Sequence, residues 1–416
     1  MPTNGNDSIA WNPLNGSIAI DGLGDSFDSN VYQPYQGSVG PTNGDMLRIE
    51  GAQAAFIRLD SWNAGIAQVG SATATFVNVE RVFGTTGNDT VRAGNVSASG
   101  PDGHGISVFT GNGNDDILGS RFGDFIDPGA GNDTVRAGDG DDFVNGSRGD
   151  DLIYGGAGQD NIRWGQGAED GNWGDGGKAF GDDTIYGGDG ADVINIWANN
   201  WDVDGASVTV TKVFADGAQK GFATIDWTGV LETLEFQGFE QIWTHGGRDT
   251  FTAAGAQIVG DMGVRYNARW GDDRLVGSSG NDTLEGGTGA DTITGGLGSD
   301  TLSGAALAGA STVVFNGGTG TFANGGSTAS FNTIETIETG AGADSINAAA
   351  NTGGASFVTG AGNDSFVGGL GAETVSGGDG DDTLIDGPGS DSLHGGAGNN
   401  RLYGGPGSDY YTYDSY

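Results

Sequence analysis

An aspartate that recurs every nine residues constrains the fold of this chain more than any other feature. From residue 111 onward, one run of such aspartates comprises Asp115, Asp124, Asp133, Asp142, Asp151 and Asp160. An aliphatic residue follows each aspartate two positions later: Ile117, Ile126, Val135, Val144, Ile153 and Ile162. A period this short predicts a solenoid, in which each repeat buries its apolar residue only by stacking on its neighbours.

The same register returns in three later parts of the chain. Its members are Asp183 and Asp192; Asp273, Asp282, Asp291 and Asp300; and Asp364, Glu373, Asp382, Asp391, Asn400 and Asp409. Glycines precede most of these residues, and glycine permits the tight turns that a short repeat needs. We therefore predict coils of 18 residues, each built from two nonapeptides with a short strand and a glycine-rich turn per nonapeptide.

The repeat resembles the G-G-x-G-x-D-x-U-x nonapeptide of RTX calcium-binding proteins of Gram-negative bacteria, where U is a large apolar residue. This resemblance implies an all-β fold: a parallel β-roll or β-helix solenoid whose coils are stacked with several calcium ions. It also implies an extracellular or cell-surface location reached by type I secretion. The metal ligands it predicts are Asp115, Asp124, Asp133, Asp142, Asp151, Asp160, Asp183, Asp192, Asp273, Asp282, Asp291, Asp300, Asp364, Asp382, Asp391 and Asp409.

Charge and composition agree with a calcium-dependent fold. The chain has 55 acidic residues against 16 Lys and Arg, so its net charge is −39, which argues against nucleic acid or an anionic membrane as a partner. Glycine accounts for 85 of the 416 residues, and such an acidic, glycine-rich chain compacts only when cations neutralise it. Cysteine is absent, which excludes disulfides, and no apolar run approaches the roughly 20 residues of a membrane span.

The two ends of the sequence bear on export. The N-terminal residues Met1-Pro2-Thr3-Asn4 lack the basic and apolar regions of a cleaved signal peptide. Relatives with RTX repeats usually carry an uncleaved export signal beyond the repeats, whereas here the last array reaches Asp409 and the sequence ends at Tyr416. We expect such a signal to be either missing from this sequence or unusually short.

Three segments interrupt the nonapeptide at about 28–80, 196–240 and 303–335. Each ends in a similar block that contains a phenylalanine and a glutamate, with an aspartate nine residues after the glutamate. The glutamates are Glu80, Glu240 and Glu335, and the aspartates are Asp89, Asp249 and Asp344. The glutamates are predicted to keep the register of the solenoid, while each of the three aspartates is either a calcium ligand or a turn former that caps its own backbone.

The repeats and interruptions give six regions. Alternating polar and apolar residues in the interruptions predict either longer strands of a widened β-helix or hairpins that flank it. Residues 101–105 and 165–178 are predicted to be loops that project from single coils. The predicted regions are a solenoid start with a strand insert (1–110), a first array (111–195), a β insert (196–248), a second array (249–302), a β insert (303–343) and a third array (344–416).

Enzymatic motifs find little support. The chain has no cysteine and no nucleophile elbow, and its three histidines, His104, His245 and His394, are too widely separated to predict a zinc site. Its Gly-x-Gly turns are not followed by a helix start, so they do not predict phosphate loops.

Aromatic and basic residues concentrate in one stretch. Most of the nine tryptophans lie between residues 164 and 270, together with much of the scarce arginine. Either the rings cap a widened core, or they form a ligand face for an acidic polysaccharide, since exposed aromatic rings and arginine suit sugar rings and uronate carboxylates. The candidate ligand-binding residues are Arg163, Trp164, Trp197, Trp243, Arg248, Arg269 and Trp270; if the face is catalytic, His245 or Tyr266 is the candidate proton carrier.

Three classes of function follow. A structural, adhesive or surface-associated solenoid is favoured because it requires nothing beyond the repeats, and its ends could join head to tail. The alternatives are a carbohydrate-binding protein and a β-helical polysaccharide lyase or hydrolase. The enzyme is the less favoured of these, because the sequence contains no clear acid-base constellation.

Overall fold

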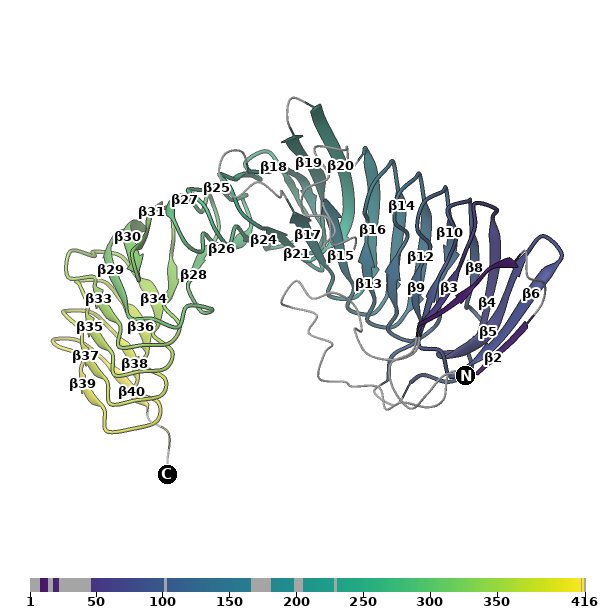
Figure 1. The fold of residues 1–416 in the computed structure, drawn as a ribbon. Helices are drawn as coiled ribbons and strands as arrows, with labels where there is room; N and C mark the ends of the chain where they lie inside the picture. Colours follow the sequence, from purple (N-terminus) through teal and green to yellow (C-terminus); the bar gives the residue numbers. More distant parts are fainter. Residues whose placement is uncertain are drawn as a thin grey trace. The chain divides into compact units, whose positions relative to one another are not determined.

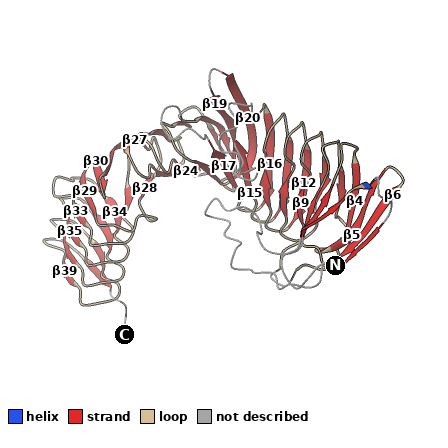
Figure 2. Cartoon of the chain, in the orientation of Figure 1, coloured by secondary structure: helices blue, strands red, loops and turns tan. Residues whose placement is uncertain are grey.

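We analysed a computed structural model of the chain, which describes residues 8–13, 18–21, 46–100, 103–165, 181–197, 205–227, 230–412 and 414. The chain forms two compact units, unit 1 with residues 1–199 and 222–242, and unit 2 with residues 200–221 and 243–416. Within the described residues there is no α-helix, and short strands joined by turns build both units (Figures 1 and 2). Those residues accordingly include no helix that could span a membrane.

Unit 1 contains two stacks of strands, which we call stack A and stack B. Stack A consists of β1 (Ser8–Trp11), β3 (Met46–Ile49), β7 (Arg81–Phe83), β9 (Ser107–Phe109), β11 (Phe125–Asp127), β13 (Phe143–Asn145), β15 (Asn161–Gly165) and β17 (Val193–Trp197). Stack B consists of β2 (Ile18–Asp21), β4 (Ala55–Ser61), β5 (Ala64–Val69), β6 (Ala72–Val77), β8 (Thr90–Arg92), β10 (Asp116–Leu118), β12 (Thr134–Asp139), β14 (Leu152–Ala157), β16 (Asp183–Asp189) and β20 (Val230–Phe239). The chain alternates between the stacks once per nonapeptide in the repeat array.

Unit 2 has the same two-stack construction. Its stack A contains β24 (Met262–Asn267), β26 (Asn281–Glu285), β28 (Thr301–Ser303), β32 (Thr336–Glu338), β34 (Ala355–Val358), β36 (Glu373–Ser376), β38 (Ser392–His394) and β40 (Tyr410–Thr412). Its stack B contains β18 (Ser207–Val213), β22 (Thr250–Thr252), β23 (Gln257–Ile258), β25 (Arg274–Val276), β27 (Ala290–Thr294), β29 (Ser311–Asn316), β30 (Thr319–Asn324), β31 (Ser327–Asn332), β33 (Ser345–Asn347), β35 (Ser365–Val367), β37 (Thr383–Ile385) and β39 (Arg401–Tyr403). Two strands, β19 (Gln219–Trp227) and β21 (Gln241–Thr244), include residues of both units.

The aliphatic residue of each repeat forms the core. In stack B of unit 1, Val91, Ile117, Val135 and Ile153 lie in register on successive parallel strands, and none of them is exposed. Leu284, Leu302 and Ile337 form an equivalent row in unit 2. Burying one such side chain contributes about 1.5–3 kcal/mol, so the stabilisation accumulates coil by coil. This arrangement confirms the predicted all-β parallel solenoid with 18-residue coils.

Two of the interruptions are antiparallel hairpins. In the first, β4, β5 and β6 form a three-stranded meander, with β6 pairing parallel to β2 and β4 pairing parallel to β8. In the third, β29, β30 and β31 form a second meander, with β31 pairing parallel to β27 and β29 pairing parallel to β33. The alternating burial along β4 and β29 reflects one face on the core and one outside. Each meander is thus inserted into stack B. Of the two predicted alternatives for these interruptions, the structure has hairpins and not longer solenoid strands.

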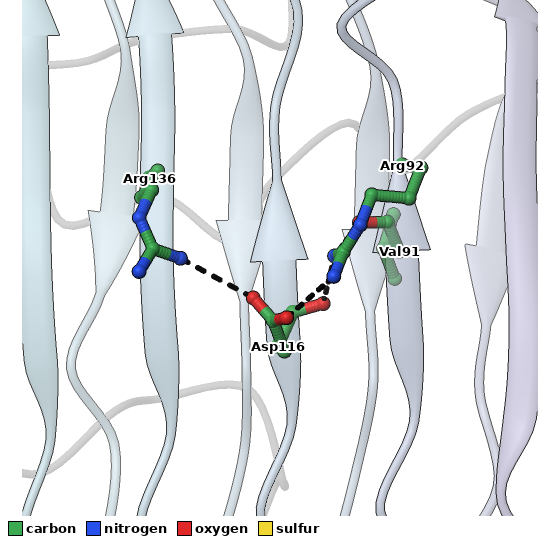
Figure 3. A network of polar contacts seen from close by, with 4 residues as sticks. All are labelled: Val91, Arg92, Asp116 and Arg136. Carbon is green, nitrogen blue, oxygen red and sulfur yellow. Dashed lines mark hydrogen bonds and ion pairs between the residues drawn. The ribbon is translucent and has the colours of Figure 1, made fainter.

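Neighbouring acidic residues of one repeat serve opposite faces. Asp115 is buried, whereas Asp116 lies on the outer face of β10, between two arginines from the adjacent strands (Figure 3). Its carboxylate accepts hydrogen bonds from Arg92 Nη2 at 2.5 Å and from Arg136 Nη1 at 3.3 Å. Exposed ion pairs of this kind contribute about 0–1 kcal/mol, so the outer face adds little to the stability supplied by the inner one.

Some predictions concern residues outside the described ranges. The predicted loop at 165–178 is described only at Gly165, and the predicted loop at 101–105 only from residue 103. The start of the first interruption, residues 28–45, also falls outside the described residues, as do residues 198–204 of the second.

Candidate metal centre

The repeat aspartates point into the solenoid. Side chains of residues i and i+2 in a strand lie on the same face, so an aspartate two positions before the buried aliphatic residue also faces inward. Asp133, Asp142, Asp282 and Asp382 are each only 1% exposed. Two rows of buried carboxylates therefore follow the turns of the coils.

One oxygen of each carboxylate caps the preceding coil. Asp133 Oδ1 accepts a hydrogen bond from the backbone N–H of Asp115 at 2.7 Å, and Asp151 Oδ1 accepts one from the N–H of Asp133 at 2.8 Å. On the other row, Asp142 Oδ1 accepts from the N–H of Asp124 at 2.7 Å, and Asp160 Oδ1 from that of Asp142 at 3.0 Å. We call each such series of bonds a carboxylate ladder.

The ladders explain the departures from aspartate. Asn400 Oδ1 accepts a hydrogen bond from the N–H of Asp382 at 2.8 Å, because this bond requires only an acceptor. Glu240 Oε2 accepts from Asp192 at 2.6 Å, and Glu335 Oε2 accepts from Asp300 at 2.8 Å. The prediction that these two glutamates keep the register is confirmed; the third, Glu80, is buried at the equivalent point of the first interruption.

The second oxygen of most ladder carboxylates is buried and has no hydrogen-bond partner. The aspartates with such an Oδ2 atom are Asp115, Asp133, Asp142, Asp151, Asp160, Asp192, Asp249, Asp273, Asp300, Asp344, Asp364, Asp382 and Asp391. A buried ionised oxygen without a donor is strongly unfavourable, so a cation is the natural partner for these atoms. Asp249 and Asp344 belong to this group, although their sequence context left their role open.

The pKa values of these carboxylates also reflect their burial without donors or positive charge. Burial raises the pKa of Asp142 and Asp151 to about 10, and the neighbouring carboxylates contribute to the rise. The pKa of Asp133 and of Asp273 is raised to about 8, again mainly by burial. A divalent cation between the coils would favour the ionised forms by supplying the missing positive charge.

Glycine makes the turns between the carboxylates possible. Before Asp142, Gly138 and Gly140 have φ angles of +131° and +111°, which side-chain-bearing residues rarely adopt. A Cβ atom on Gly158 would lie 2.1 Å from the carbonyl oxygen of Gly140 in the preceding coil, so the coils stack too closely for a side chain there. Backbone oxygens and carboxylates thus converge, which fits calcium, an ion that takes about six to eight oxygen ligands.

Three of the described repeat aspartates accept hydrogen bonds on both carboxylate oxygens from a serine or threonine four residues earlier. Asp282 accepts hydrogen bonds from the N–H and the hydroxyl of Ser278, at 2.5 and 2.6 Å, and Asp124 is held by Ser120 in the same way, at 2.6 and 2.7 Å. Thr85 makes the matching pair of bonds to Asp89, at 2.6 and 2.7 Å. We call these the hydroxyl turns, and the turns with glycine four residues before the aspartate the glycine turns.

The hydroxyl turns argue against the predicted role of Asp124 and Asp282 as calcium ligands, because both carboxylate oxygens already have protein donors. Asp183 also differs, since the indole N–H of Trp164 donates to its Oδ2 at 2.5 Å and the N–H of Asp151 donates to its Oδ1. Serine or threonine stands four residues before the aspartate in each hydroxyl turn, but this is not a sufficient signal, because Ser147, four residues before Asp151, donates to Asp127 instead.

Comparison with known protein families gives seven matching segments. They match the family described as RTX calcium-binding nonapeptide repeat (4 copies), at residues 78–95, 109–144, 127–162, 179–198, 268–302, 350–384 and 376–411. The chain contains RTX calcium-binding nonapeptide repeats in several copies. No curated protein sequence matches it significantly. The RTX repeats bind calcium, and the carboxylates with an unpartnered oxygen fit that ion, whose charge would neutralise the buried row.

Two further RTX positions were predicted as ligands. Asp291 is buried and accepts a hydrogen bond from the N–H of Asp273 at 3.0 Å, as a ladder residue does. Asp409 is half-buried, and its Oδ1 accepts from the N–H of Asp391 at 3.2 Å. Both therefore occupy the ladder position of their repeats.

The predicted aromatic ligand face falls into two groups, one in each unit. In unit 1, Trp164 is completely buried and Arg163 is 4% exposed, with its guanidinium carbon 4.2 Å from the ring centroid of the half-buried Trp197. The position of Trp164 in the core does not suit a ligand platform. Trp173 and Trp201 lie outside the described residues.

In unit 2, the remaining candidates form a small cluster. The Arg269 guanidinium carbon lies 4.6 Å from the Trp243 ring centroid, and the ring of Trp270, 41% exposed, lies 5.4 Å from that of His245. Arg248 is exposed. Arg269 has a φ of +64° because it occupies the glycine position four residues before Asp273.

The two predicted proton carriers differ from what general acid-base chemistry needs. Tyr266 is 3% exposed, stacks on Phe251 at 4.1 Å and shares a 2.8 Å hydrogen bond with Thr244. Burial raises the pKa of Tyr266 well above its ordinary value, so this hydroxyl stays protonated near neutral pH. His245 is also buried, at 8% exposure. Tyr266 is thus a core residue of the RTX solenoid.

Proposed function

We propose that this RTX-repeat protein acts outside the cell, after type I secretion, as a calcium-stabilised structural or adhesive element. The supporting observation is the distribution of the carboxylate ladders, which recur from coil to coil in both units. Calcium bound along such ladders would stabilise each unit over its whole length and not at one local site. A rigid element that folds only where calcium is abundant suits a surface or extracellular role.

Calcium-dependent assembly tests this proposal. The full chain is followed by light scattering and electron microscopy in calcium and in chelator, and its binding to bacterial surfaces is measured in parallel. A structural or adhesive role predicts calcium-dependent association, either head to tail between copies or with a cell surface. A monomeric chain that binds no surface but releases unsaturated uronates from polysaccharides would contradict it.

A carbohydrate-binding role is the second candidate, and the cluster of Trp243, His245, Arg269 and Trp270 favours it. The exposed indole of Trp270 and the guanidinium of Arg269, which lies over the Trp243 ring, are groups that suit a sugar ring carrying a carboxylate. Unit 2 would then present a binding surface on a calcium-stabilised scaffold.

A glycan array with the calcium-loaded chain tests this second role. Binding to uronate-containing glycans that is lost in Trp270→Ala supports it, and the exposed Tyr403 gives a matched control, Tyr403→Ala. If Trp270→Ala binds the same glycans as the wild type, the cluster is not the binding surface.

A further inference from the structure

Asp386 occupies a repeat position that belongs to glycine. It lies two residues after the buried Leu384, where other repeats have glycines such as Gly119, Gly155 and Gly377. Its side chain lies against the preceding coil, since a Cβ atom built on Gly368 would approach Asp386 Oδ1 to 1.6 Å. The backbone N–H of Asp386 donates to the carbonyl oxygen of Tyr403, and the backbone N–H of Gly387 donates to Asp386 Oδ1.

This placement brings a third carboxylate to a ladder position. One ligand oxygen each from Glu373, Asp386 and Asp391 lie within 4.8 Å of one another. The three side chains are 1%, 7% and 1% exposed. Glu373 and Asp391 are consecutive ladder residues, joined by the bond from the Glu373 N–H to Asp391 Oδ1 at 3.1 Å.

Each of the three carboxylates has one oxygen without a donor. These atoms are Glu373 Oε2, Asp386 Oδ2 and Asp391 Oδ2, all buried. Glu373 Oε1 is held in place by the side-chain amide of Asn351 at 2.7 Å, which leaves Oε2 for another partner. None of the interactions that shift the pKa values of the three groups comes from a basic residue.

We propose that Glu373, Asp386 and Asp391 form a three-carboxylate calcium site that fills before the two-carboxylate positions of the same array. Calcium affinity rises with the number of charged ligands and with the rigidity of the site. Asn351 supplies rigidity, and Asp386 supplies the additional charge. The inference rests on calcium occupancy of the RTX arrays, and it is independent of whether the protein is structural or adhesive.

Hydrogen exchange against free calcium tests the site in the full chain. The variants are Asp386→Asn, which keeps the shape, and Asp386→Gly, which restores the residue of the repeat; Asp379→Asn changes a carboxylate of the same array outside the cluster. In the wild type, β36 and β38 should become protected at lower calcium than β35 and β37. Both Asp386 variants should shift the midpoint for β36 and β38 roughly tenfold upward, while Asp379→Asn leaves it unchanged.

The possible results separate the explanations. Reduced protection at saturating calcium with an unshifted midpoint would make Asp386 a structural residue and overturn the proposal. A midpoint that moves to lower calcium would show that Asp386 only repels its neighbours, which also overturns it. If the wild type shows no response to calcium anywhere, the calcium-stabilised function itself fails, whereas a responsive wild type with unaltered variants rejects only the three-carboxylate site.

Discussion

The glycine turns and the hydroxyl turns both bury a repeat carboxylate, but they differ in the donors that they offer to its second oxygen. Both place a buried carboxylate where one oxygen caps the coil before it. In the glycine turn of Asp142 the other oxygen has no protein donor, whereas in the hydroxyl turn of Asp282 the N–H and hydroxyl of Ser278 satisfy the carboxylate. In these two turns the difference lies four positions before the aspartate, where Gly138 has no hydroxyl and Ser278 donates one.

The comparison indicates that the need for a cation differs from turn to turn. The hydroxyl turns contain Asp89, Asp124 and Asp282 and are separated along the chain by glycine turns. Because coils in a solenoid contact mainly their neighbours, a self-satisfied turn can lend stability to adjacent turns that need an ion. The following four predictions address this difference, beginning with the largest effect.

Removing calcium should cause the largest change. In chelator, the glycine turns retain buried carboxylates without partners, and the few hydroxyl turns cannot offset the resulting repulsion. We expect the chain to lose its β-rich circular dichroism spectrum in EDTA and to regain it with calcium at or below the millimolar range. An unchanged β spectrum at vanishing calcium would show that the glycine turns are stable by themselves.

Asp133→Ala should produce a large but local effect in a glycine turn. The substitution removes a predicted calcium ligand and leaves the buried N–H of Asp115 without its acceptor, at a cost of about 1–3 kcal/mol for that group. Hydrogen exchange should show lost protection in residues 111–162 and unchanged protection in residues 344–412. Equal loss of protection in both segments would contradict the local character of the coils.

Ser278→Gly should convert a hydroxyl turn toward a glycine turn. The carboxylate of Asp282 loses the hydroxyl donor of Ser278 but keeps the backbone N–H of residue 278, so stability at fixed calcium should fall by about 1–3 kcal/mol and should depend more steeply on calcium. Thermal unfolding at several calcium concentrations measures both changes. Ser279→Gly, at the exposed neighbouring position, is the control; equal calcium dependence of both variants and the wild type would mean that the hydroxyl does not substitute for the ion.

Asp116→Asn should have the smallest effect. It breaks the outer ion pairs with Arg92 and Arg136, which are worth about 0–1 kcal/mol, and leaves the inward carboxylate of Asp115 in place. The melting temperature should fall slightly, with an unchanged calcium midpoint. Asp115→Asn is the matched inner variant, and a similar midpoint shift in both would remove the distinction between the two faces.

The sequence was sufficient to predict the solenoid because its two decisive signals are local. The spacing of aspartate and aliphatic residue determines the strand face, and the glycines determine the turn, so the coil length and the inward direction of Asp133 or Asp382 follow from the repeat alone. Glu240 and Glu335 were identified by the same spacing. The meanders were only one of two alternatives, because alternating residues do not reveal whether strands pair antiparallel.

Other features depend on contacts between coils. The hydrogen bond from Asn351 to Glu373 joins residues 22 apart, which is not a multiple of nine. Asp386 lies one coil after Gly368, but a single repeat does not show that its side chain lies against that glycine. The buried position of Trp164 agrees with one of the two alternatives, rings that cap a widened core, and that of Tyr266 was not predicted. Clustering in sequence does not distinguish an exposed aromatic side chain from a buried one. Ser120 and Ser278 donate to Asp124 and Asp282, whereas Ser147, at the same position before Asp151, donates to Asp127, so the geometry was needed to identify the hydroxyl turns.

The carboxylate ladders give the solenoid a polarity. The backbone N–H of each ladder residue donates a hydrogen bond to the carboxylate of the following coil. Asp115 donates to Asp133 in this way, and Asp364 donates to Asp382. Cutting the chain after any ladder coil therefore leaves a buried amide without an acceptor, whereas removing coils that precede it merely frees a carboxylate oxygen for water or an ion. Nested truncations should accordingly be tolerated better from the N-terminal side, and a repeat unit transplanted into another protein should need a terminal cap on its C-terminal side.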